Sequence, residues 1–169
     1  MPEIIKRSML AEYINVTPGE VTADYERIGF GVEGKSTEYS PEIDERQFID
    51  EDSPNSSVKR YNQSSEFDII AAKDSPVFEY LDTLRVTRAI YADAETDVVE
   101  VRLYEPTSAV AGNTSYAATK TLVAVSINSI GDAAEDPLTL SATLSGKGDP
   151  IQGTFDFATS AFTATVVTP

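Results

Sequence analysis

The chain has 169 residues, enough for one domain with a sizeable core, and 41% of them are hydrophobic, including eight tyrosines and seven phenylalanines. Thirteen basic residues against 28 acidic ones give a formal net charge of −15, which argues against binding to nucleic-acid phosphates. With no cysteine and no histidine, the sequence excludes disulfides, thiolate or imidazole metal ligands, and Ser-His-Asp triads.

The amino-terminal segment has no apolar run of the length found in a secretory signal. No window approaches the ~18 consecutive apolar residues that a membrane helix needs. We therefore expect a soluble protein that is made without export and has no membrane partner. Further along, Ile28, Phe30 and Val32 alternate with glycines, which predicts a strand.

A long excursion is predicted from Val32 to Phe67. Its middle, residues 40–57, contains proline breakers and six acidic residues against the single Arg46. Long connections of this kind in a compact domain are either functional or disordered. We interpret the excursion as two extended strands with a flexible acidic tip. The acidic residues of this segment are Glu42, Asp44, Glu45, Asp50, Glu51 and Asp52.

One helix is well signalled, from Pro76 to about Thr87. Ser75 is a suitable N-cap, Pro76 occupies the first helical position, and Glu79 lies in the first turn. Apolar residues then recur with helical spacing and form a single stripe, which we expect to close one end of the core. The stripe consists of Val77, Tyr80, Leu81 and Leu84.

The rest of the chain predicts strands. Apolar alternation marks residues 96–104, 116–130, 138–144, 151–157 and 162–166, and residues 146–150 have the composition of a turn. Short strands at this spacing are typical of a β-sandwich or barrel. The expected fold is mainly β, with one flanking α-helix and a long extended loop or hairpin, in a single domain that spans residues 1–169.

The acidic residues between Glu42 and Asp52 allow three interpretations: a metal loop, a catalytic carboxylate pair, or a negative surface that is simply solvated or serves in an assembly. The spacing lacks the central glycine and terminal glutamate of an EF-hand. A second acidic segment, residues 131–137, has the composition of an ordinary turn. We predict no catalytic residues, no cofactor and no metal site, and hence a protein that is not an enzyme.

Three segments in the last third of the chain carry a resemblance to a known family. They are residues 123–131 (VAVSINSIG), 136–138 (DPL) and 148–156 (GDPIQGTFD). The upstream order is similar as well, with an acidic excursion, a helix that ends in LRVTR and a following strand. In these features the chain resembles the major tail proteins, or tail tube proteins, of long non-contractile-tailed bacteriophages of Gram-positive hosts.

The resemblance implies a structural virion protein with no enzymatic activity. Members of that family form hexameric rings that stack into the tail tube, through which double-stranded DNA passes without specific binding. It further implies assembly in the host bacterial cytoplasm, and a tape measure protein, a tail terminator and a distal tail protein as partners. The acidic residues 42–52 would then lie in the lumen or between subunits.

An alternative is a secreted or surface β-sandwich module for binding or adhesion. That interpretation predicts an export signal or neighbouring domains. A concentration-dependent change from monomers to rings or tubes distinguishes the two functions.

Overall fold

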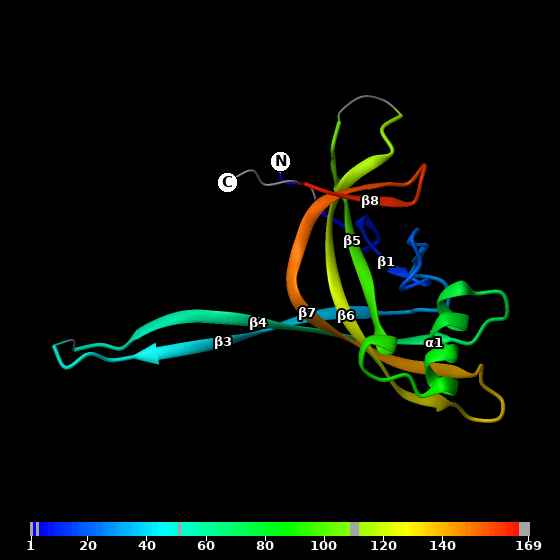
Figure 1. The fold of residues 1–169 in the computed structure, drawn as a ribbon, viewed down its shortest axis with the longest axis horizontal. Helices are drawn as coiled ribbons and strands as arrows, with labels where there is room; N and C mark the ends of the chain where they lie inside the picture. Colours follow the sequence, from blue (N-terminus) through cyan, green and yellow to red (C-terminus); the bar gives the residue numbers. More distant parts are fainter. Residues whose placement is uncertain (1, 3, 51, 109–111, 166–169) are drawn as a thin grey trace.

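The computed structural model describes residues 2, 4–50, 52–108 and 112–165 (Figure 1). The fold is mainly β, as the alternating segments predict, with one α-helix on its flank. No helix in this part of the chain is long and apolar enough to cross a membrane. In chain order the elements are η1 (Arg7–Met9), β1 (Leu10–Asn15), β2 (Tyr25–Arg27), β3 (Lys35–Arg46), β4 (Asn55–Ile70), α1 (Pro76–Thr87), η2 (Tyr91–Ala94), β5 (Glu95–Pro106), β6 (Ser115–Gly131), β7 (Thr139–Asp156) and β8 (Ala161–Ala164).

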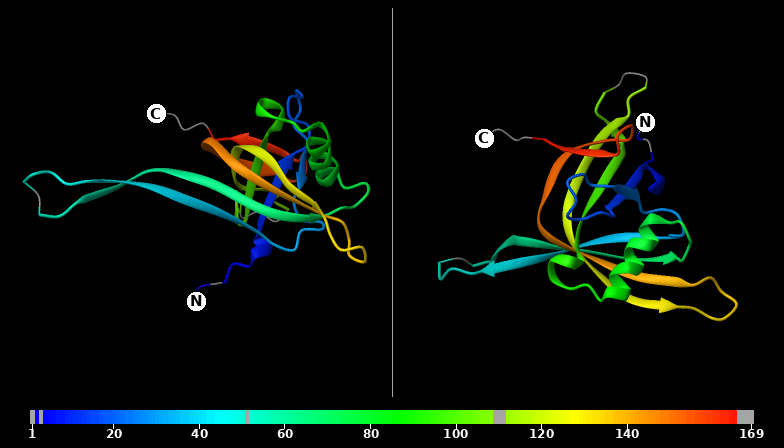
Figure 2. Two further views of the ribbon diagram at one scale, coloured as in Figure 1. Left: turned by 90° about the horizontal axis from the view of Figure 1, so that it is seen from below. Right: turned by 45° about the vertical axis from the view of Figure 1, so that its right-hand side comes forward.

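All strands belong to one antiparallel sheet with the order β2-β1-β5-β6-β7-β4-β3, and β8 pairs with β7. The sheet curls because its longest strands bend: β6 shifts register against β7 twice, and β7 pairs with β4 through its first half and with β8 through its last residues. Bulges of this kind increase local twist and bend a strand. The result is a strongly curved body from which β3 and β4 project as a long arm (Figures 1 and 2).

Two apolar clusters fill the body. The first lies between α1 and the sheet and includes Phe67, Leu81 and Leu140. The second, at the other end, is built around Phe155, whose ring stacks on Tyr13 with a centroid distance of 4.7 Å. Burial of these large side chains supplies the main driving force for folding. None of the described residues on the outer part of the arm, residues 36–64, is buried.

Helix α1 covers one face of the sheet through Val77, Leu81 and Leu84, which are buried, while Tyr80 is partly buried against the same cluster. The range Pro76–Thr87 is the one that the sequence predicts. Arg88 ends the helix in the left-handed conformation, with φ of 51°, and its N–H donates to the carbonyls of Leu84 and Arg85.

Two local predictions differ from the structure. Residues 28–31 form turns and Val32 lies outside any strand, because Gly31 has a φ of +74° and lies against the backbone of Ile70. Residues 146–150 belong to the continuous strand β7 instead of separating two strands, and Gly148, with a φ of +72°, lies at the bend. Of the predicted strand 162–166, residues 162–164 belong to β8, and residue 166 lies outside the described residues.

Candidate assembly surface

The arm formed by β3 and β4 is the most distinctive feature of the surface. The two strands pair continuously from Lys35 opposite Phe67 to Arg46 opposite Asn55. The pairing of β4 with β7 stops at Ser64, so the outer part of the hairpin has no third strand among the described residues. Figure 1 shows this part projecting far beyond the body. An isolated two-stranded hairpin is at best marginally stable in water, which points to a partner that covers it.

The projecting hairpin has one apolar face. Residues directly opposite each other in an antiparallel pair lie on the same face of the ribbon, and successive residues alternate between faces. Pro41 pairs with Tyr61, and Ile43 pairs with Val58. The aromatic and aliphatic residues of this face are each more than half exposed. The apolar hairpin face consists of Tyr39, Pro41, Ile43, Val58 and Tyr61.

The opposite, polar hairpin face carries Glu38, Glu42 and Asp44. A bulge between Glu42 and Ile43 places both Lys59 and Arg60 near Glu42, whose carboxylate accepts from them at 2.9 and 2.6 Å. The hydrogen bond from Lys59, together with the nearby charge of Arg60, lowers the pKa of Glu42. Two cations of β4 therefore neutralise part of the negative charge of β3.

The six acidic residues fall into two groups. Glu42, Asp44 and Glu45 belong to β3 itself and not to the tip, because β3 continues through Pro41 as far as Arg46. Asp50 and Asp52 lie in the loop that joins β3 to β4, and Glu51 lies outside the described residues. Phe48 and Ile49 sit beside the loop acids and are strongly exposed. The tip thus combines apolar and acidic side chains.

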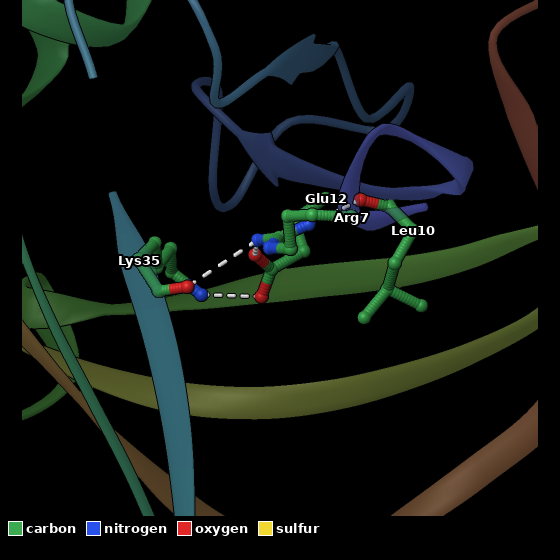
Figure 3. Close-up of polar contacts among 4 residues, drawn as sticks. All are labelled: Arg7, Leu10, Glu12 and Lys35. Atoms are coloured by element: carbon green, nitrogen blue, oxygen red, sulfur yellow. Dashed lines mark hydrogen bonds and ion pairs between the residues drawn. The ribbon is translucent and has the colours of Figure 1, made fainter. Parts of the chain in front are cut away.

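The hairpin root is held by a buried ion pair. Lys35, at the start of β3, donates from Nζ to Glu12 on β1, and its side chain is only 3% exposed (Figure 3). Arg7 adds a second cation to the same carboxylate at 3.0 Å and donates to the carbonyl of Leu10. The cluster ties the hairpin to β1 and η1 and so fixes the direction in which the arm leaves the body.

A second carboxylate, Glu100 on β5, lies near this cluster. Burial, reinforced by the negative charge of Glu12, raises the pKa of Glu100. The folded protein therefore holds this proton more tightly than the unfolded chain does. Its free energy of unfolding should fall as the pH rises from the ordinary carboxyl range through the raised pKa.

We expect Glu100→Gln to melt at a higher temperature than the wild type at pH 7.5, because the neutral amide avoids the cost of burying a charge. Each kcal/mol gained corresponds to about 2–4 °C in a protein of this size. Thermal unfolding followed by circular dichroism between pH 4 and 8 measures the difference, which should shrink toward pH 4. A variant that melts lower than the wild type at both ends of this range would contradict the assignment.

The described part of the chain contains no group of three or more acidic residues that could hold a metal ion. Two open grooves lie on the surface of the body, one beside η1 and the turns after β2, and another between α1 and β6. What the surface offers instead is an amphipathic arm and the outer edges of the strands β2 and β3.

Sequence patterns alone do not identify the hairpin-root residues Lys35 and Glu12, which are 23 positions apart in the chain. No local motif links them. The only local sign of this pair is Glu12 itself, a charged residue within the otherwise largely apolar segment that forms β1.

Solved structures share this architecture, although no sequence match is found. No protein-family model matches the sequence, and a search of curated proteins gives no match. Among solved structures, the tail of an empty gene transfer agent particle, with C6 symmetry, superposes with a TM-score of 0.60 at 10% identity, covering 95% of this chain and 100% of that one. The virion of a native gene transfer agent gives a TM-score of 0.60 at 9% identity over the same shares.

The SPP1 tail tube superposes with a TM-score of 0.58 at 12% identity, covering 88% of this chain and 78% of that one. At these identities the likeness is one of fold. The chain has the fold of tail tube proteins, as the resemblance in its last third predicts.

Proposed function

We propose that this protein is a structural, non-enzymatic tail tube protein of a bacteriophage or a related particle. In this proposal it forms six-membered rings that stack into a hollow tube, and double-stranded DNA passes through that tube during genome ejection. The observation that carries the proposal is the exposed amphipathic hairpin on a body whose fold is that of tube-forming proteins. The tape measure protein, tail terminator and distal tail protein are its proposed partners in a virion tail assembled in the host cytoplasm.

The exposed apolar face of the hairpin supports self-assembly. Contiguous exposed apolar side chains mark interaction sites in soluble proteins. The hairpin differs from the body that carries it, so its docking on a neighbour joins two different surfaces. Such heterologous contacts close into rings or continue into helical tubes.

The charge of the chain supports a conduit. A wall that carries net negative charge repels phosphates and lets DNA move without firm contacts. If the apolar hairpin face packs against a neighbour, the polar hairpin face turns away from that contact. We place Glu38, Glu42 and Asp44 of this face toward the lumen.

Reversing acids of the polar hairpin face tests this placement. Glu38→Lys with Asp44→Lys should leave tubes intact and make them retain short DNA duplexes at low salt, with release at high salt. Glu42 is left unchanged because it binds Lys59 and Arg60. At 0.1 M salt, only charges within about 10 Å of the duplex act on it, so the substitutions should cause retention only if these residues face the lumen.

Co-sedimentation of tubes with labelled duplex measures the retention. A matched control makes the same charge change on the β6–β7 loop, with Asp132→Lys and Glu135→Lys. Retention by the control and by the polar-face variant to the same extent would place Glu38 and Asp44 outside the lumen.

A further inference from the structure

The groove between α1 and β6 is an apolar surface with a positive rim. It has a volume of about 560 Å³, and its lining includes Leu84, Ile90, Val125, Ile127 and Ile130. Ile90 is 64% exposed, and Ile127 and Ile130 are partly buried against the first core cluster. The groove therefore exposes apolar area that is continuous with the protein core.

One wall of the groove is an open strand edge. The pairing of β6 with β5 ends where Ala124 meets Glu95, whereas its pairing with β7 continues to Gly131. Within the described residues, the edge of β6 from Val125 onward has no strand partner on the side away from β7. Its backbone groups are available to an incoming extended segment.

The rim of the groove is cationic. Arg85 and Arg88 line it, and no acidic residue does. Arg85 binds Asp82 through a single 2.8 Å contact, and Arg88 has no carboxylate partner among the described residues. A partner for this groove should therefore bring apolar side chains together with carboxylates.

The hairpin tip has that composition. Phe48 is 56% exposed and Ile49 is fully exposed at 108%, and Asp50 and Asp52 follow directly. In Figures 1 and 2 the tip and the α1–β6 region lie at opposite ends of the molecule's longest dimension. One copy cannot fill its own groove, but two copies arranged head to tail bring the tip and the groove together.

We infer that the hairpin tip of one subunit docks in the α1–β6 groove of the next, with Phe48 and Ile49 against its isoleucines and Asp50 beside Arg88. This inference rests on the proposed tube function and specifies the contact that propagates the assembly. It commits to a second copy of this chain as the occupant, because the charge and the apolar character of the two surfaces are complementary.

Cysteine cross-linking tests the contact directly, since the natural chain has no cysteine. The variant Ile49→Cys with Ser129→Cys places one thiol on the tip and one on the exposed edge of the groove. Disulfides form only when Cα atoms come within about 7 Å. Oxidation of assembled protein should give a covalent ladder that extends beyond dimers on non-reducing gels.

Two controls limit the interpretation. Each single-cysteine variant can form dimers at most. The pair Ile49→Cys with Val21→Cys moves the second thiol to another fully exposed position on the β1–β2 loop and should give no ladder.

Charge reversal provides an independent test. Arg88→Glu and Asp50→Lys should each raise the protein concentration needed for assembly by about tenfold, the equivalent of ~1.4 kcal/mol. A mixture of the two variants should assemble at nearly the wild-type concentration, because each tip then meets a groove of opposite charge. Lys73→Glu, the same charge change at the other end of α1, should have no effect on assembly.

Electron microscopy of the same samples separates the two levels of the proposal. Tubes with a ladder, and rescue by mixing, support the tip-in-groove contact. The contact is overturned if tubes form without a ladder and neither charge reversal changes the concentration needed for assembly. That result leaves the tube function standing. Protein that forms no tubes under any condition overturns both.

Discussion

Replacing residues 41–61 with Asn-Gly should convert the protein into a folded monomer that no longer forms tubes. Ser40 and Asn62 face each other in the hairpin, so a two-residue turn of this type can join them. No described residue of the removed segment is buried, and both core clusters stay complete. The body should unfold cooperatively at close to its normal temperature while assembly is lost.

Sedimentation velocity measures the loss of assembly, and thermal unfolding measures the stability of the body. A finer version changes only the apolar hairpin face, with Tyr39→Ser and Tyr61→Ser, and should also prevent assembly. Its control changes the polar hairpin face, with Ser40→Ala and Asn62→Ala, and should assemble normally. Tubes of normal length from the truncated protein would show that the hairpin is not the assembly element.

Removing the carboxylate at the hairpin root should have the largest effect on stability among single substitutions of charged residues. Glu12→Ala leaves the almost fully buried ammonium of Lys35 without its ion-pair partner. Breaking a buried pair in this way costs about 3–5 kcal/mol. At about 2–4 °C per kcal/mol, the melting temperature should fall by roughly 10 °C.

The matched control is Asp44→Ala, which removes the exposed ion pair with Arg46 at 2.9 Å. An exposed pair contributes about 0–1 kcal/mol, so this variant should melt close to the wild type. Chemical denaturation of all three proteins gives the free energies of unfolding. Equal losses from both substitutions would contradict the role of Glu12 as the anchor of the arm.

The sequence was most informative where the pattern is local. The spacing of Val77, Leu81 and Leu84 predicts α1 because one turn of helix determines which residues share a face. Alternation likewise predicts β5 and most of β6. These elements depend on neighbours within a few positions, and their apolar residues contribute to both core clusters.

Features set by distant parts of the chain were not predictable in the same way. Pro41 suggests a break, yet β3 continues through it because an edge strand tolerates a residue without an N–H. Gly148 and Pro150 suggest a turn, yet β7 only bends there, since its pairing with β6 holds both halves in one sheet. The ion pair of Lys35 with Glu12 and the groove beside β6 arise only when the sheet curls.

Cryo-electron microscopy of assemblies formed from the purified protein tests the central claim most directly. We expect hollow tubes of stacked six-membered rings, with the hairpin of each subunit in contact with a neighbouring subunit. A protein that stays monomeric at high concentration, or that forms solid fibres without a channel, would contradict it.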